Sequence, residues 1–215
     1  SAAVLLIPVL IATYSLFNTL KEWNNLPVEQ VELTTAYGLI SKITLPDGSE
    51  VWLNSGSSIS YPKRFTDNKR NIQLTGEAYF KVTSDKSNRF DVLTSNGLKV
   101  SAYGTEFNVK AYEDEDKIEA TLAKGHIEVT EIGQPVSRTL RPGEQAVYYK
   151  NTSRMEVDKV NLAVETSWKD GKMIFRRANM NEIVQRLARH FNVDIKLEGE
   201  ELYDYNYSAT LPQRH

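Results

Sequence analysis

Residues 40–54 read Ile-Ser-Lys-Ile-Thr-Leu-Pro-Asp-Gly-Ser-Glu-Val-Trp-Leu-Asn, and this stretch is the clearest local indication of the fold. Pro46, Asp47 and Gly48 separate two apolar runs. Proline presets φ, aspartate caps a turn and glycine accepts a positive φ, so these three residues favour a β-hairpin. We therefore expect two antiparallel strands joined at Asp47 and Gly48.

The same period of two dominates the sequence from Gly38 to Val160. Glycine, asparagine, aspartate or proline interrupts most of the runs, at intervals of roughly ten residues. The alternating apolar positions are Ala78, Phe80, Val82, Phe90, Val92, Leu98, Val100, Ala102, Phe107, Val109, Ala111, Ile118, Ala120, Leu122, Ile127 and Val129. This spacing predicts a mainly β domain over residues 38–165, built as an antiparallel β-sandwich, a jelly roll or a solenoid-like stack. Gly76, Gly125 and Gly143 are expected at strand entries.

The composition excludes several kinds of functional site. The chain has 215 residues, no cysteine and a formal net charge of −2. Without cysteine there is no disulfide framework, no thiolate metal site and no cysteine nucleophile. The near-neutral charge argues against a nucleic-acid-binding protein. The histidines His126, His190 and His215 are far apart in sequence, and we predict neither a metal site nor a cofactor.

No catalytic motif stands out either. Four carboxylates are available in the β domain: Asp47, Glu77, Glu106 and Glu119. No spacing among them selects a catalytic pair. We expect them to lie at solvated strand positions or to cap turns. Residues 113–116 (Glu-Asp-Glu-Asp) lack the alternation of a calcium loop and are expected to form a polar hairpin tip. No P-loop, GxSxG, Rossmann or HExxH motif is present. The chain is predicted not to be an enzyme.

The first twenty residues differ from the rest. Residues 2–20 contain no charged side chain, and nineteen helical residues would span about 28 Å, close to the hydrocarbon thickness of a bilayer. We predict a transmembrane helix over residues 1–20, followed by a linker over residues 21–37. A secretory signal peptide and a buried core helix are the alternatives. Because the chain begins at Ser1 without methionine, we expect further sequence upstream.

Near Trp168 the hydrophobic period changes. Residues 172–176 are expected to form a strand, and Asn179 and Glu182 have the spacing of a capping box. The apolar face of the helix that follows consists of Met180, Ile183, Val184, Leu187, Ala188 and Phe191. Residues 193–197 and residues 203–211 are expected to form further strands. The pattern predicts a small βαβ domain over residues 166–215, which we expect to be truncated at its C-terminal end.

The polar side of this helix is basic. Arg186, Arg189 and His190 lie together on it. Such a face is usually solvated, and an acidic partner is the alternative.

Four sequence blocks, in order, resemble FecR-type transmembrane regulators. The blocks are residues 45–54, 74–82, 104–109 and 142–146. These regulators are the anti-sigma factors of iron and glycan uptake systems in Gram-negative bacteria. Residues 173–211 are similar to the small domain that follows the FecR domain in Bacteroidetes members, a relative of the secretin/TonB N-terminal fold.

The resemblance implies a route for a signal. A cytoplasmic domain, missing here, would bind an extracytoplasmic-function (ECF) sigma factor, and one helix would cross the inner membrane. The periplasmic part, which is the bulk of this chain, would contact the signalling domain of an outer-membrane TonB-dependent transporter. The resemblance implies no catalytic residue.

The motif residues themselves are expected to specify the fold and not to form the binding surface. They are Pro46, Asp47, Gly48, Leu53, Asn54, Gly76, Glu77, Ala78, Phe80, Gly104, Thr105, Phe107, Pro142, Gly143 and Glu144. The partner-contact residues cannot be assigned from the sequence, and an exposed strand edge in the βαβ domain is our hypothesis.

Two other functions remain open. One is a membrane-anchored carbohydrate-binding β-sandwich, and the other is a β-sandwich hydrolase. The carbohydrate-binding function would use exposed aromatic side chains from the set Trp52, Tyr61, Tyr103, Tyr112, Tyr148 and Tyr149.

Overall fold

A computed structural model describes residues 8, 11–18, 28–65, 69–95, 97–134, 136–199, 201–202 and 205–212. Most of the predicted membrane segment (residues 1–20) lies outside these ranges. Residues 11–18 are helical and mostly exposed. Within the ranges described, no helix combines the length and the apolar character needed to cross a membrane. The span therefore stays a prediction.

The bulk of the chain is one thirteen-stranded sheet, here called the β body. Its strands are β1 (Gln30–Thr34), β2 (Ser41–Thr44), β3 (Glu50–Leu53), β4 (Ser58–Pro62), β5 (Lys69–Lys81), β6 (Arg89–Thr94), β7 (Leu98–Ala102), β8 (Glu106–Ala111), β9 (Lys117–Lys124), β10 (Ile127–Glu131), β11 (Ser137–Leu140), β12 (Glu144–Tyr149) and β13 (Arg154–Lys159). All neighbouring strands are antiparallel except β5 and β6, which are parallel. The prediction of a mainly β fold is confirmed.

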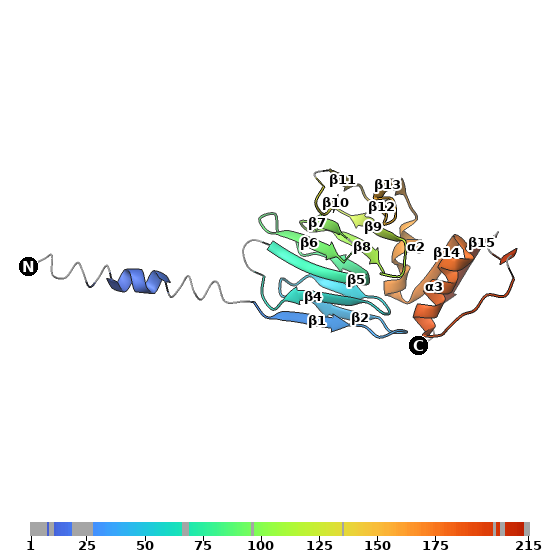
Figure 1. Ribbon diagram of the computed structural model, residues 1–215, viewed down its shortest axis with the longest axis horizontal. Coiled ribbons are helices and arrows are strands. Elements are labelled where there is room, and N and C mark those ends of the chain that lie inside the picture. The colour runs from blue at the N-terminus through green and yellow to red at the C-terminus, as the bar shows by residue number, and fades with distance from the viewer. Residues whose placement is uncertain are drawn as a thin grey trace, which may run out of the picture.

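The long strand β5 connects the two halves of the β body (Figure 1). Its first part pairs with β4 and β6, and its last part pairs with β3 and β8. Gly76 lies at the change of partners with a φ of +94°. A Cβ atom there would come within 2.3 Å of Ser57 Oγ, so only glycine fits. Gly76 is thus inside a strand, not at a strand entry as expected.

The two halves face each other across a single hydrophobic core. From β6 onward, successive pairs of strands along the chain are added alternately to the two halves. The resulting order of neighbouring strands in the sheet is β11-β10-β7-β6-β5-β8-β9-β12-β13. The ring centroids of Phe80 on β5 and Phe90 on β6 are 5.9 Å apart, and those of Phe80 and Phe107 on β8 are 5.1 Å apart. Every alternating apolar position predicted from the sequence is buried.

The predicted hairpin is present. Strands β2 and β3 pair antiparallel, and Gly48 has a φ of +81°. Asp47 Oδ1 accepts a hydrogen bond from the Ser49 N–H at 3.0 Å. Asp47 Oδ2 lies 2.7 Å from Arg70 Nη1, which fastens the turn to β5.

The β body begins earlier than predicted. Residues 30–34, inside the expected linker of residues 21–37, form β1 and pair with β4. Val31 packs against the core. Only Val31 of this strand is partly buried, so the stretch lacks the alternation of buried side chains by which the other strands were predicted.

The C-terminal part contains short helices and a two-stranded sheet, in orange and red in Figure 1. Its elements are α2 (Leu162–Thr166), the 3₁₀ helix η1 (Ser167–Asp170), β14 (Lys172–Asn179), α3 (Met180–Phe191) and β15 (Asn206–Pro212). We call residues 172–212 the C-terminal unit. Asn179 Oδ1 accepts a hydrogen bond from the Glu182 N–H at 2.9 Å, so the predicted cap of α3 is confirmed.

The strand order of the βαβ prediction needs correction. Residues 193–197 are not a strand, and β14 instead pairs antiparallel with β15, with a bulge between Phe175 and Ala178. Val193, Ile195 and Leu197 do alternate. Alternation supplies only an apolar side, however, and a strand also needs a neighbour for its backbone groups. The helices α2 and η1 were not predicted.

Candidate functional site at the junction

Motif residues converge on a buried carboxylate where the β body meets the C-terminal part. Asn54 Nδ2 donates a hydrogen bond to Glu77 Oε2 at 2.7 Å, and Asn108 Nδ2 donates to Glu77 Oε1 at 2.8 Å. Trp168 Nε1 of η1 donates to Asn108 Oδ1 at 3.2 Å. Asn54 and Glu77 were selected from the sequence. Asn108 was not, although it belongs to the third motif block.

Burial dominates the electrostatics of this carboxylate. Glu77 is only 8% exposed. Loss of solvation raises the pKa of Glu77, and the charge of Lys110 and the two amide donors oppose this rise. The amide donors satisfy a group whose burial without partners would be costly.

Helix η1 is firmly attached to the β body. Trp168 is 7% exposed. The next residue, Lys169, places its ammonium 5.1 Å from the ring centroid of Tyr79 and 5.9 Å from that of Trp52. Cation–π attraction of this kind adds to the hydrogen bond of the indole.

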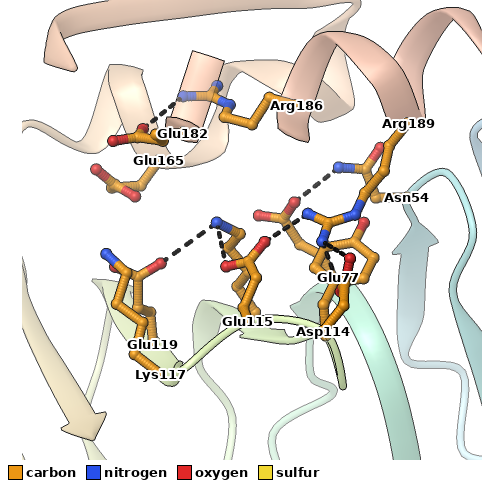
Figure 2. Close-up of polar contacts among 12 residues, drawn as sticks. Asn54, Glu77, Asp114, Glu115, Lys117, Glu119, Glu165, Glu182, Arg186 and Arg189 are labelled. Atoms are coloured by element: carbon orange, nitrogen blue, oxygen red, sulfur yellow. Dashed lines mark hydrogen bonds and ion pairs between the residues drawn. The ribbon is translucent and has the colours of Figure 1, made fainter. Parts of the chain in front are cut away.

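A second attachment comes from α3, whose only buried residue is Arg189. Arg189 Nη2 donates to both carboxylate oxygens of Asp114, at 2.7 and 2.8 Å, and Nη1 donates to Glu115. Arg189 Cζ lies 3.8 Å from the ring centroid of Tyr112. Figure 2 shows Arg189 reaching from α3 toward Asp114 and Glu115.

Two expectations bear on this contact. Residues 113–116 do form the polar tip of the β8–β9 hairpin, but Glu115 within it is only 6% exposed. Arg189 follows the alternative given for the basic side of the helix, because Asp114 and Glu115 of the same chain are its acidic partners. The helical period identified the polar side of α3 but carried no information about what lies opposite.

Further ion pairs extend across the outer face of β8 and β9. Lys110 Nζ lies 2.7 Å from Glu115 Oε2 and 3.7 Å from Glu119 Oε2, and Lys117 Nζ lies 2.7 Å from Glu119 Oε1. Burial alone would raise the pKa of Glu119, but Lys110 and Lys117 outweigh it and lower that pKa. The facing carboxylates likewise raise the pKa of Lys110 against its burial.

A cavity of about 250 Å³ lies between this face and the C-terminal unit. Glu165 of α2 lines it, and burial, followed by the charges of Glu119 and Glu77, raises the pKa of Glu165 to about 7. On the far side, Arg186 pairs with Glu182 at 3.4 Å and lies over the ring of Phe175 at 4.5 Å. Figure 2 shows Glu165 next to Glu182.

The chemistry of the junction is that of an ionic interface. Within the ranges that the structure covers, no group of three or more metal-ligating side chains could hold a metal ion. The four carboxylates first considered for catalysis are engaged with other groups. Asp47 pairs with Arg70, and Glu106 accepts a hydrogen bond from the Tyr79 hydroxyl. The expectation of solvated positions was therefore wrong for Glu77 and Glu119.

The remaining motif residues lie in the core or in turns. Leu53, Ala78, Phe80 and Phe107 are fully buried. A Cβ atom at Gly104 would meet Ser84 at 2.7 Å, and Thr105 beside it is buried. Pro46, Pro142 and Gly143 are turn residues, and the Glu144 carboxylate accepts a hydrogen bond from the Arg141 N–H at 2.8 Å.

The aromatic residues proposed for carbohydrate binding do not form an exposed platform. Tyr61, Tyr112 and Tyr148 are buried, and Trp52 packs edge-on against Tyr79. Of the six, only Tyr103 and Tyr149 rank among the exposed large side chains, on separate parts of the body. This weakens the carbohydrate-binding alternative.

Comparison with known proteins places the chain in a family. Residues 31–128 match the family model described as FecR protein, and residues 172–215 match the one described as FecR, C-terminal. Two crystal structures of a candidate anti-sigma factor from Parabacteroides distasonis ATCC 8503 are similar, each with a TM-score of 0.79. Sequence identity is 27% in one and 28% in the other; the alignments cover 87% and 86% of this chain, respectively, and 86% of the compared chain in both. Comparison with curated proteins gives no match.

The two family matches together cover about two thirds of the sequence and correspond to most of the β body and to the C-terminal unit. The junction described above lies between them. The chain belongs to the FecR family, with a FecR domain followed by a FecR C-terminal domain.

Proposed function

We propose that this chain is the signal-transmitting part of an anti-sigma regulator. In the proposed arrangement, residues 1–20 cross the inner membrane once and the remainder lies in the periplasm. The regulator senses an outer-membrane TonB-dependent transporter through the signalling domain of that transporter. It controls an ECF sigma factor through a cytoplasmic domain that precedes this sequence.

The observation that carries the proposal is the pair of domains joined by an ionic interface. The similar structures from Parabacteroides distasonis are of a candidate anti-sigma factor, and the alignment extends over both domains. An interface made of ion pairs and hydrogen bonds is easier to open than an apolar one, since its groups can be rehydrated. A relay protein needs such a contact between its parts.

The direction of the chain is consistent with this role. Strand β1 runs toward the end of the β body at which α3 and β14 lie (Figure 1). The loop after β1 reaches α3, where the Gly38 N–H donates a hydrogen bond to the Arg189 carbonyl oxygen at 3.0 Å. Sequence that precedes β1 thus enters at one end, and the C-terminal unit lies at the other. The role proposed is regulatory and includes no catalytic step.

The decisive experiment is a pull-down with the full-length protein in detergent. The probes are the signalling domain of the transporter encoded next to it and the sigma factor encoded beside both. We expect both to be retained, and we expect transporter substrate to change expression from a sigma-dependent reporter. Binding of a glycan array, together with no retention of either protein, would contradict the proposal and support the carbohydrate-binding alternative.

A further inference from the structure

The segment between β8 and β9 is a built site for a guanidinium group. We propose that Tyr112, Asp114 and Glu115 bind an arginine side chain, that Arg189 fills this site in cis, and that emptying it releases the C-terminal unit. A partner that presents an arginine would compete for the same site. The proposal rests on these contacts and not on the identity of the sigma factor or transporter.

The geometry of the site fits a guanidinium in three ways. The ring of Tyr112 lies under Arg189 Cζ at 3.8 Å. Asp114 accepts two hydrogen bonds from one nitrogen, and Glu115 accepts one from the other. An aromatic face combined with carboxylates around a planar fork of donors is recognition that lysine cannot reproduce.

The β body builds the site without help from Arg189. The Tyr112 hydroxyl donates a hydrogen bond to the Ser55 carbonyl oxygen at 2.9 Å. Lys150 Nζ donates to the Tyr112 carbonyl oxygen at 2.8 Å. Glu115 keeps Lys110 as an ion-pair partner at 2.7 Å. An empty site would therefore keep its shape and would leave no buried carboxylate without a cation.

The C-terminal unit, in contrast, is joined to the β body by the ion pairs of Arg189 and by the backbone hydrogen bond from the Gly38 N–H to the Arg189 carbonyl oxygen. Arg189 is the only buried residue of α3, and it borders the cavity, whose lining mixes charged side chains such as Glu165 with apolar ones such as Met173 and Leu211. Gly171, with a φ of +72°, separates the unit from η1, which Trp168 and Lys169 hold on the β body. Across Gly171 the Ser167 hydroxyl donates a hydrogen bond to the Lys172 carbonyl oxygen at 3.0 Å, so a movement of the unit about Gly171 that leaves η1 in place also breaks this bond.

The test measures the distance between the two parts. Because the chain has no cysteine, Lys124→Cys on β9 and Asn181→Cys on α3 provide two exposed and unique sites for spin labels. We expect one narrow distance distribution in the parent protein. In Arg189→Ala the ratio of closed molecules, with the short distance, to open molecules, with a longer one, should fall by about tenfold or more. The reason is that α3 loses its ion pairs with Asp114 and Glu115 and its contact with the Tyr112 ring.

Chemical rescue tests the ligand class. Millimolar ethylguanidinium should bind the empty site of Arg189→Ala and raise its thermal midpoint, whereas ethylammonium should not. Asp114→Asn, at a largely exposed carboxylate, should open the parent protein and abolish rescue in the double variant. Arg186→Ala is the matched control, because Arg186 pairs within α3 and lies over Phe175 of the same unit.

Three results would overturn the proposal. The first is a distance distribution in Arg189→Ala or Asp114→Asn that equals that of the parent. The second is equal rescue by ethylguanidinium and ethylammonium, or none by either. The third is an Arg186→Ala variant that opens as far as Arg189→Ala. If Arg189→Ala proves unfolded by circular dichroism, the same distance measurement is made on Asp114→Asn and Arg189→Lys.

Discussion

Single residues determine where β5 changes its pairing partners and which charges lie at the junction. Gly76 permits β5 to change partners because it has no side chain facing Ser57. Glu77, the next residue, directs its carboxylate to the two asparagines of the junction. The change of strand partners and the polar centre of the interface therefore lie next to each other on one strand.

The conformation of Gly76 gives a first prediction, a loss of stability in Gly76→Ala. A positive φ costs alanine about 1–2 kcal/mol, and the overlap with Ser57 adds a further cost of about 1–3 kcal/mol. The control is Gly133→Ala, where φ is +89° but no atom lies within 4 Å of the added Cβ. Urea unfolding of both variants checks this. Equal losses would show that Ser57 moves aside freely.

The raised pKa of Glu165 gives a second prediction, on pH. In the folded protein the pKa of the Glu165 carboxyl is about 7, whereas the ordinary pKa is 4.5. The folded state therefore keeps this proton to a higher pH than the unfolded state does. The stabilisation that comes from this proton is fully present below pH 4.5 and is lost as the pH rises through 7. The charged groups that face it are Glu119, Glu77 and Glu182, which raise its pKa, and Arg186, which lowers it.

The measurement compares urea midpoints of the parent and Glu165→Gln between pH 5 and pH 8. We expect the parent to lose stability relative to Glu165→Gln as the pH rises, because glutamine does not titrate. Glu128→Gln, at an exposed position of β10, should follow the parent. A constant difference between parent and Glu165→Gln would contradict the prediction.

At the scale of elements, α3 depends on its cap as well as on its contact. The helix has twelve residues, and its first turn is held by Asn179. At its other end Asn192 takes the left-handed conformation, and the Gly38 N–H of the β body binds the Arg189 carbonyl. Both ends of α3 are therefore fixed, but only the C-terminal end depends on contact with the β body.

Removing the cap gives a third prediction. Asn179→Ala should destabilise the protein by about 1 kcal/mol, because the Glu182 N–H loses its acceptor. The loss should appear as lower helix content in circular dichroism and as an earlier thermal transition. Asn181→Ala changes an exposed asparagine two residues later and should have no such effect. A loss of equal size there would contradict the role of the cap.

At the scale of the whole molecule, all the strands described for the β body lie after the first twenty residues. Its first strand begins at Gln30, and the hydrophobic core draws its residues from Val31 onward. Nothing described in residues 11–18 is part of that core, since these side chains are mostly exposed.

Deletion of residues 1–20 is the fourth prediction. We expect the shortened chain to keep the circular dichroism spectrum and the urea midpoint of the full chain. Loss of the cooperative transition would mean that the segment belongs to the core, and it would contradict the proposed membrane span.

Local patterns in the sequence determined the strands. The turn at Asp47 and Gly48, the alternation of buried side chains and the capping box at Asn179 each act over a few residues, so the sequence was sufficient to predict them. The same patterns could not place β1 or reject a strand at residues 193–197, because strand formation also needs a neighbouring backbone. The resemblance to FecR proteins rested on four such local blocks.

Only the tertiary structure decided the junction. Arg189 and Asp114 are 75 residues apart, and Trp168 and Asn108 are 60 apart, so no spacing in the sequence connects them. The helical period gave α3 a polar side, and the composition gave many carboxylates. Which charge meets which depends on how β8, β9 and α3 are placed by the fold, and burial at that place then sets the pKa values. The physical reason is that hydrophobic periodicity is a local property of the chain, whereas ionic partners are chosen by topology.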